Sequence, residues 1–211
     1  MAARRPKASF AERREERAAI EDPAVVLEAA ARFLEARSRS IAEVRRRLGR
    51  AGYRTELVEA AIARLTELGM LDDEAFGRAW VESRDRAHPR GEIALRRELS
   101  LKGVDRAIVA DLLDERRGAA EADPEAIGVD LTAARRLLAR NERALRRVAD
   151  PRQRRQRAYA LLARHGFDPE TCREASAGVA AASDDAADDA ADRVGNESPD
   201  GAASEDRPDE G

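Results

Sequence analysis

Aromatic residues are scarce in this sequence, which holds one tryptophan, two tyrosines and four phenylalanines among 211 residues. Proteins that stack bases on aromatic platforms need more of them, so any contact with nucleic acid would depend mainly on charge. The single cysteine, Cys172, excludes an internal disulfide and a metal site made of cysteines alone; its apolar helix position predicts a core residue. No apolar run approaches the roughly 20 residues that a membrane-spanning helix needs.

Motifs for nucleotide binding and nucleophilic catalysis are also missing. The sequence contains neither GxxxxGK[ST] nor GxGxxG, the loops that hold phosphates. Its only histidines, His88 and His165, are far apart, and neither has a cysteine or serine nearby in the arrangement of an activated nucleophile. We therefore expect a protein that is not an enzyme and that has no cofactor.

The N-terminal stretch MAARRPKASFAERREERAA has basic residues but no apolar segment after them. A secretory signal needs that apolar segment, so none is expected here. Together with the lack of a membrane span, this favours a cytoplasmic protein.

Charge is divided unevenly along the chain. From Gly178 onward there are 11 acidic and 2 basic residues, whereas the rest carries 37 basic and 31 acidic residues. A basic body predicts a polyanionic partner. All basic residues except Lys7 and Lys102 are arginines, which weakens this inference because a GC-rich genome also enriches arginine. The tail has almost no large apolar side chain, so we expect it to be disordered. One hypothesis is that the acidic tail competes with DNA for binding to the basic part of the chain.

Helical periodicity extends over the sequence between about residues 22 and 177, and alternating patterns typical of strands are absent. Three segments share one pattern: VRRRLGRAGY (44–53), LRRELSLKGV (95–104) and AYALLARHGF (158–167). Their first and fifth residues are apolar and lie on one face of a helix. The ninth residue is glycine, which is expected to end the helix, and the apolar tenth residue can pack back against it.

A further helix is expected before and after each of these segments. The expected ranges are about 24–37 and 55–68, 72–87 and 105–117, and 130–147 and 168–177. The sequence thus predicts an all-α fold with three tandem three-helix repeats in an elongated, curved array with disordered termini. The predicted divisions are a charged N-terminal extension with a short helix from Ser9 (1–21), the repeats (22–69, 70–119 and 120–177) and the acidic disordered tail (178–211).

Several helix starts carry capping signals. Ser40 and Glu43 have the spacing of a capping box, and the helix that follows, 40–52, should bury Ile41, Val44 and Leu48. Asp-Pro pairs supply an N-cap acceptor followed by a residue suited to the first helical position, and they occur at 22–23, 123–124, 150–151 and 168–169.

Three consecutive acids, Asp72, Asp73 and Glu74, precede the only tryptophan. Consecutive helical residues point about 100° apart and cannot converge on one metal without other ligands. We interpret Asp72 as an N-cap and the other two as first-turn acids that favour the helix dipole. A Mg²⁺-dependent nuclease built on these acids is a distant alternative. The helical interpretation predicts a staple of Leu71 on Phe76 and a buried stripe of Phe76, Ala79 and Trp80.

The segment GMLDDEAFGRAWVESR (69–84) resembles the signature of the RecX family of bacterial regulatory proteins. The resemblance continues through Arg90-Gly91, Arg97-Glu98-Leu99 and Lys102-Gly103-Val104. SRSIAEVRRRLGRAGY and VEAAIARLTELGML in the first repeat also fit, and the third repeat is a weaker match. The similarity covers about residues 24–175 and implies tandem three-helix units, in agreement with the periodicity.

Members of the RecX family bind the RecA recombinase filament along its groove and usually inhibit strand exchange and ATP hydrolysis, and some also bind DNA. The resemblance therefore implies a regulator of RecA filament growth that acts in homologous recombination, DNA repair and the SOS response. The expected partners are the RecA filament and single- or double-stranded DNA, with no membrane, and the protein is expected to be a monomer. The alternative is a sequence-independent DNA-binding protein that acts without RecA.

Two arginine-rich surfaces are candidates for contact with the filament or with phosphate. One lies on helix 40–52 opposite its buried face, and the other comprises the loop SRDRAHPRG (83–91) and the helix after it. A charged helix face is commonly just solvated, so a purely structural interpretation stays open for both. The candidate residues are Arg46, Arg47, Arg50, Arg54, Arg84, Arg86, Arg90, Arg96, Arg97 and Lys102.

Overall fold

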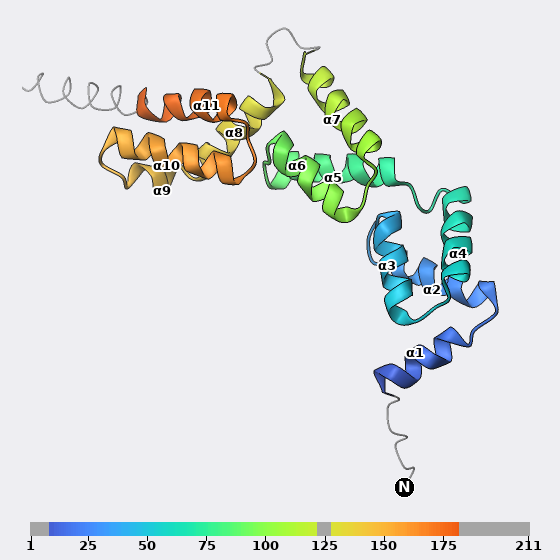
Figure 1. Ribbon diagram of the computed structural model, residues 1–211. Coiled ribbons are helices and arrows are strands. Elements are labelled where there is room, and N and C mark those ends of the chain that lie inside the picture. Colours follow the sequence, from blue (N-terminus) through green and yellow to red (C-terminus); the bar gives the residue numbers. More distant parts are fainter. Residues whose placement is uncertain (1–8, 122–127, 182–211) are drawn as a thin grey trace, which may run out of the picture.

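The computed structural model describes residues 9–121 and 128–181, and these residues form helices and no strands. The helices follow one another along an elongated, curved path (Figure 1). Their bounds are α1 Phe10–Ala18, α2 Pro23–Glu35, α3 Ile41–Ala51, α4 Thr55–Glu67, α5 Asp73–Ala87, α6 Glu92–Lys102, α7 Arg106–Glu121, α8 Val129–Arg140, α9 Glu142–Arg146, α10 Pro151–Arg164 and α11 Pro169–Ala181.

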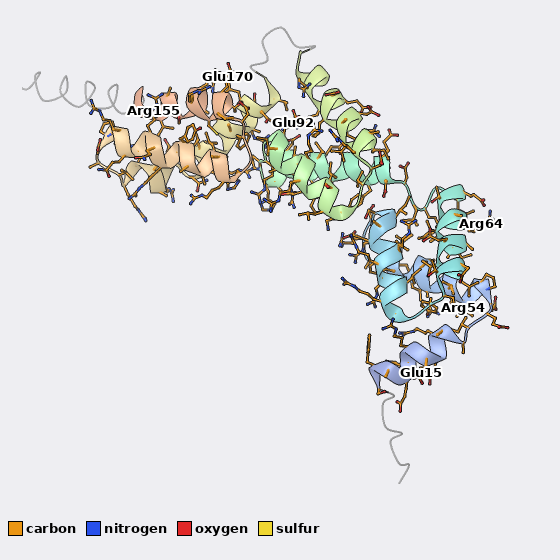
Figure 2. The ribbon with its side chains drawn as sticks, viewed as in Figure 1. Glu15, Arg54, Arg64, Glu92, Arg155 and Glu170 are labelled. Atoms are coloured by element: carbon orange, nitrogen blue, oxygen red, sulfur yellow. The ribbon has the colours of Figure 1, made fainter. Side chains whose placement is uncertain are left out.

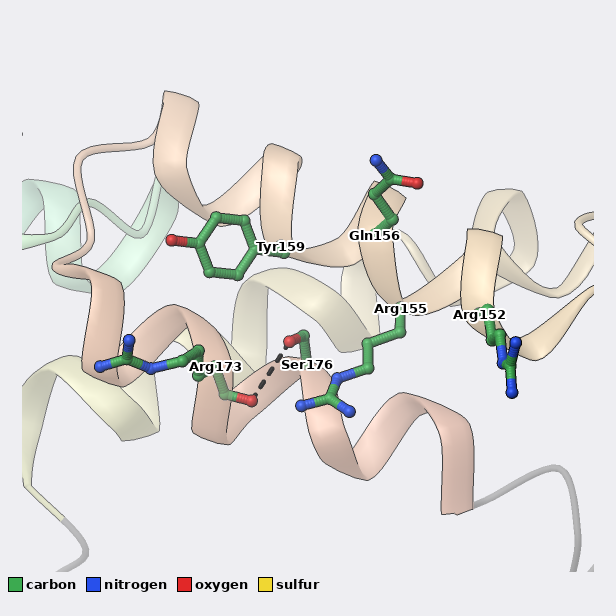
Figure 3. Close-up of a pocket in the computed structure, with 6 residues that line it drawn as sticks. All are labelled: Arg152, Arg155, Gln156, Tyr159, Arg173 and Ser176. Carbon is green, nitrogen blue, oxygen red and sulfur yellow. Dashed lines mark hydrogen bonds between the residues drawn. The ribbon is translucent and has the colours of Figure 1, made fainter.

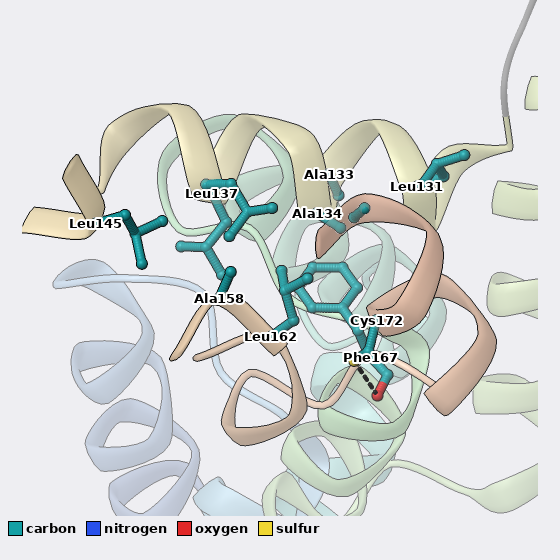
Figure 4. Packing of buried hydrophobic residues seen from close by; sticks show 11 residues of the cluster. Leu131, Ala133, Ala134, Leu137, Leu145, Ala158, Leu162, Phe167 and Cys172 are labelled. Carbon is teal, nitrogen blue, oxygen red and sulfur yellow. Dashed lines mark hydrogen bonds between the residues drawn. The ribbon is translucent and has the colours of Figure 1, made fainter. Parts of the chain in front are cut away.

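Three separate apolar cores hold the array together, one for each repeat. The first lies among α2, α3 and α4, the second among α5, α6 and α7, and the third among α8 to α11. Figure 4 shows the third core, in which Leu162, Phe167 and Cys172 pack together. The predicted all-α fold of three tandem three-helix repeats is therefore confirmed, and Cys172 is a buried core residue as expected. The disordered tail is predicted from residue 178, but α11 continues to Ala181, so that boundary is wrong. The rest of the predicted tail, 182–211, and the N-terminal residues 1–8 lie outside the described residues.

The shared ten-residue pattern forms the middle helix of each repeat and its end. The first and fifth positions of all three segments are buried. Gly52, Gly103 and Gly166 have φ values of 104°, 82° and 78°, in the left-handed region that favours glycine. The residue after each glycine donates its backbone N–H to the carbonyl of the fifth position, for example Val104 to Leu99 at 3.1 Å. This closed turn is the Schellman end that the pattern predicts.

The first helix of the third repeat differs from its prediction. The prediction of a single helix over 130–147 is wrong, because the helix is interrupted at Asn141, between α8 and α9. Asn141 adopts φ −103° and ψ 7°, and its side-chain amide donates to the carbonyl of Leu137 at 2.9 Å. The bend that results turns Leu145 and Val148 into buried positions. Asparagine competes for backbone hydrogen bonds in this way more readily than most residues.

Most predicted caps are present. The carboxylates of Asp22, Asp150 and Asp168 each accept from the backbone N–H two residues later, at 2.9 Å. The Asp-Pro pair at 123–124 lies outside the described residues. The helix expected at Ser9 is α1, and Ser9 forms a full capping box with Glu12.

The N-cap predicted at Ser40 is present, whereas one predicted packing detail of α5 is wrong. The Oγ of Ser40 accepts from the N–H of Glu43 at 3.1 Å, and the Glu43 carboxylate also pairs with Lys102 at 2.9 Å. On α5, Ala79 is exposed, and Gly77 is buried in its place beside Leu112 of α7.

Candidate partner and nucleic-acid interface

The acids before Trp80 have structural roles at the start of α5. Asp72 is the N-cap, and its Oδ1 accepts from the N–H groups of Glu74 and Ala75 at 2.8 and 3.0 Å, which confirms the prediction. Leu71 belongs to the first core and Phe76 to the second, so they anchor two different cores instead of forming one staple. Within the described residues, no group of three or more His, Cys, Asp or Glu side chains is placed to hold a metal ion.

Asp73 joins the first repeat to the second. Its Oδ1 accepts from the backbone N–H of Ile41, the first residue of α3, at 2.9 Å. Burial raises the pKa of Asp73 above its usual value, and Asp72 adds to this effect, although the N–H of Ile41 opposes it. Ser40 strengthens the junction by donating its hydroxyl to the carbonyl of Lys102 at 2.6 Å.

The junction between the second and third repeats has the same design. The N–H of Glu92, the first residue of α6, donates to Asp130 of α8 at 2.9 Å. Arg116 bridges Asp85 and Asp130, and its side chain is only 7% exposed. Each junction therefore caps the middle helix of one repeat with an aspartate from the first helix of the next.

Three of the candidate cations, Arg84, Arg90 and Lys102, are engaged in contacts within the chain. Arg84 and Lys102 lie over the ring of Trp80, at 4.4 and 4.7 Å from its centroid. The Glu98 carboxylate accepts from the indole Nε1 at 2.9 Å and from Arg84 at 2.7 Å, and Arg90 lies 3.2 Å from it. The side chains of Arg84, Arg90 and Lys102 are 24%, 31% and 23% exposed, respectively. These cations stabilise the second repeat and its junction with the first.

The candidates on α3, together with Arg54 just after it at the N-cap of α4, are more accessible, and we call these four arginines the α3 group. Arg46, Arg47, Arg50 and Arg54 are all exposed. Arg46 reaches only the carbonyl of Lys102, at 3.4 Å, and Arg47 lies 5.7 Å from the ring centroid of Phe33. None of the four makes an ion pair with a described residue, so their charges are available to a partner.

The other exposed candidates lie on the second repeat. Arg96 pairs with Glu92 at 2.8 Å, whereas Arg97 has no carboxylate partner among the described residues. The side chain of Arg86 is exposed, and its backbone carbonyl accepts from the guanidinium of Arg140 at 3.2 Å. The ten candidates thus form one accessible group on α3, scattered members on α5 and α6, and an internal cluster around Trp80.

A cleft of about 380 Å³ lies where the second and third repeats meet. Burial lowers the pKa of His165 in its wall and outweighs the raising effect of the Pro89 carbonyl, while the charges of Arg90 and Arg164 also lower it. The neutral ring can accept from Arg90, whose guanidinium lies 3.2 Å from Nδ1. The cleft is lined by Arg84, His88, Pro89, Arg90, Leu137, Arg140, Asn141 and His165.

The third repeat contains basic residues that the sequence analysis did not single out. Residues 129–177 hold twelve arginines and six acidic residues, the largest basic excess of the three repeats. Figure 2 shows Arg155 far along the array from Arg54 and Arg64 of the first repeat. The signal was the run PRQRRQR (151–157), with four arginines and no acid, which the weaker repeat pattern of this region obscured.

The fold and its surface define a class of protein. Small helical units in a row with arginine-rich surfaces are typical of helical repeat proteins, which present extended binding surfaces. In the described part of the chain, no helix has the length and apolar character needed to cross a membrane. Three models of RecX three-helix domains match this chain: the first at residues 27–65, the second at 72–113 and the third at 129–175.

Known relatives agree with these matches. The regulatory protein RecX of Chlorobaculum tepidum is 33% identical over 149 residues, which cover 70% of this chain and 84% of that protein. RecX of Pelodictyon phaeoclathratiforme is 41% identical over 86 residues, which span 41% of this chain and about half (54%) of that protein. The crystal structure of RecX from Lactobacillus salivarius has the same fold, with a TM-score of 0.62 at 17% identity over 75% of this chain and 97% of that one. The chain belongs to the RecX family of regulatory proteins.

Proposed function

We propose that this protein binds the RecA–DNA filament and mostly inhibits RecA ATP hydrolysis, filament growth and strand exchange. Family membership supports a regulatory role, and the elongated array suits a filament, because a row of repeats can contact several protomers in turn. The observation that carries the proposal is the exposed arginine group of α3, which makes no ion pair with a described residue.

The proposed mechanism is steric and electrostatic. Rigid junctions at Asp73 and Asp130 hold the repeats in a fixed curve that lies in the filament groove and obstructs duplex entry or subunit addition. The protein breaks no bonds itself, so Asp72, Asp73 and Glu74 act only in the fold. Nicking of DNA in the presence of Mg²⁺, abolished by Asp73→Ala, would contradict this.

The DNA-dependent ATPase of RecA tests the proposal when it is measured with and without this protein over a salt series. Arg50→Ala combined with Arg54→Ala removes two charges from the α3 group. Arg64→Ala combined with Arg106→Ala removes two exposed charges elsewhere and is the matched control. We expect inhibition by the parent and by the control, and at least several-fold weaker inhibition by the α3 variant. Equal inhibition by both variants would exclude α3 as the contact.

The alternative is a sequence-independent DNA-binding protein that acts without RecA, and the basic excess of the third repeat favours it. The two functions differ in the protein concentration at which the RecA ATPase is suppressed. A RecA regulator suppresses the ATPase below the concentration at which it coats the DNA. A DNA-binding protein acts only by occupying DNA, with a steep dependence on salt.

A further inference from the structure

A pocket of about 270 Å³ lies between α10 and α11 in the third repeat, next to the basic run at 151–157. Figure 3 shows arginines from both helices around it. No carboxylate lines it, although acidic residues are present elsewhere in the repeat. The lining residues are Arg152, Arg155, Gln156, Tyr159, Arg173 and Ser176.

The three arginines of the pocket are exposed and have no acidic partner among the described residues. Most carboxylates near them are already used inside the chain. Those of Asp150 and Asp168 cap α10 and α11, and that of Glu174 lies 3.5 Å from Arg135. The positive charges of Arg152, Arg155 and Arg173 are therefore not compensated within the described structure.

The base of the pocket is rigid. Ser176 is 1% exposed and donates its hydroxyl to the backbone carbonyl of Arg173 at 3.2 Å. Tyr159 packs against the third core, in which its neighbour Ala158 is completely buried. Because both helices are held by one core, the arginines start from fixed backbone positions, and a ligand has less to order when it binds.

The chemistry of this site fits a phosphate. A guanidinium offers a planar fork of N–H donors that matches two phosphate oxygens, and such charge-assisted pairs are stronger than neutral hydrogen bonds. Cations that share one pocket repel one another, and a bound anion relieves that repulsion.

We infer that the pocket between α10 and α11 binds a backbone phosphate of DNA through Arg152, Arg155 and Arg173. This deepens the proposed function and rests on it for the source of the DNA, the strand in the filament. The third repeat then holds the nucleic acid, while the arginines of α3 contact the filament at the other end of the array.

The test is equilibrium binding of the full chain to a fluorescent single-stranded oligonucleotide, followed by anisotropy at several salt concentrations. The pocket variant carries Arg152→Ala, Arg155→Ala and Arg173→Ala. The control carries Arg143→Ala, Arg147→Ala and Arg157→Ala, three exposed arginines of the same repeat that do not line the pocket. Thermal melting checks that both variants are folded, since all six side chains lie at the surface.

We expect the pocket variant to bind about tenfold more weakly or worse, and its plot of log affinity against log salt to lose at least about one unit of slope. The control should stay close to the parent. Equal losses in both variants would show that only general charge matters and would overturn the inference.

A second outcome would also overturn it. If the pocket variant binds DNA like the parent, and if removal of 182–211 raises affinity in the parent but not in the pocket variant, then the occupant is the acidic tail. The RecA ATPase keeps this result separate from the proposed function. A parent that binds DNA through the pocket but leaves RecA unaffected refutes the proposed function alone.

Discussion

At the scale of single residues, Asp73 and Trp80 show how ordinary side chains set the geometry of the array. Asp73 looked like one of three acids at a helix start, but its carboxylate joins α3 to α5. Trp80 looked like a core residue, but it is half-buried between two cations and donates to Glu98. In both cases the residue holds two segments that are distant in sequence.

Asp73→Ala is expected to lower the free energy of unfolding by about 1–3 kcal/mol, because the N–H of Ile41 loses its acceptor at a partly buried junction. Asp73→Asn should cost much less, since the amide oxygen still accepts and the neutral group suits a position where burial raises the carboxyl pKa. Urea denaturation followed by Trp80 fluorescence measures both. Equal losses in the two variants would mean that the negative charge, not the acceptor, stabilises this junction.

His165 should make stability depend on pH. Burial lowers its pKa below the ordinary value of 6.5, so the folded state favours the neutral ring. The contribution of neutral His165 to the free energy of unfolding is complete above pH 6.5. It is lost as the pH falls from 6.5 through the lower pKa that His165 has in the folded state. Melting temperatures of the parent should therefore drop more below pH 6.5 than those of His165→Asn. Parallel curves for the two proteins would argue against this role.

At the scale of elements, the glycine after each middle helix does two things. Its positive φ ends the helix, and its lack of a side chain allows a close approach to the preceding element. A methyl group at Gly103 would overlap Ala42 of α3, and one at Gly166 would overlap Ala94 of α6. One at Gly52 would overlap Arg14, so α1 packs on the first repeat much as each repeat packs on the next.

Gly103→Ala should therefore destabilise the protein more than Gly69→Ala. Both glycines have positive φ, which costs an alanine about 1–2 kcal/mol. Only Gly103 has a neighbour in the way, and such overpacking adds about 1–3 kcal/mol. Urea denaturation compares the two variants. If Ala42→Gly does not relieve part of the loss in Gly103→Ala, the cost does not come from this junction.

At the scale of the whole molecule, charge is separated along the array. The second repeat, residues 72–121, has ten basic and twelve acidic residues, whereas the first and third have an excess of arginine. The acidic tail follows the third repeat, and its residues 182–211 lie outside the described structure. A nearly neutral middle between two basic ends is the charge distribution that the proposed contacts with a filament at two places require.

Removal of 182–211 is expected to raise DNA affinity at low salt, because the deletion removes all 11 acidic residues of the tail that follows the basic body. The gain should shrink at high salt, where such charges are screened. Anisotropy with a labelled oligonucleotide at two salt concentrations measures this. Unchanged affinity at low salt would remove the idea that the tail competes with DNA.

The sequence by itself determined the helices, their ends and the repeat. Apolar spacing, N-caps and terminal glycines act within a few residues, so the pattern of Val44, Leu48 and Gly52 predicts its own local structure. The same locality gave the resemblance to RecX. The prediction from periodicity failed at Asn141, where a side-chain hydrogen bond to the carbonyl of Leu137 interrupts the helix.

Only the tertiary structure decided which charges are free. Lys102 meets Glu43 across 59 positions of sequence, and Arg84 turns toward Trp80 instead of a partner. Arg152 and Arg173 line the same pocket because α10 and α11 share one core. The strength of an ion pair depends on the distance between its two charges. The packing of apolar faces sets that distance, so the order of charges along the sequence does not predict it.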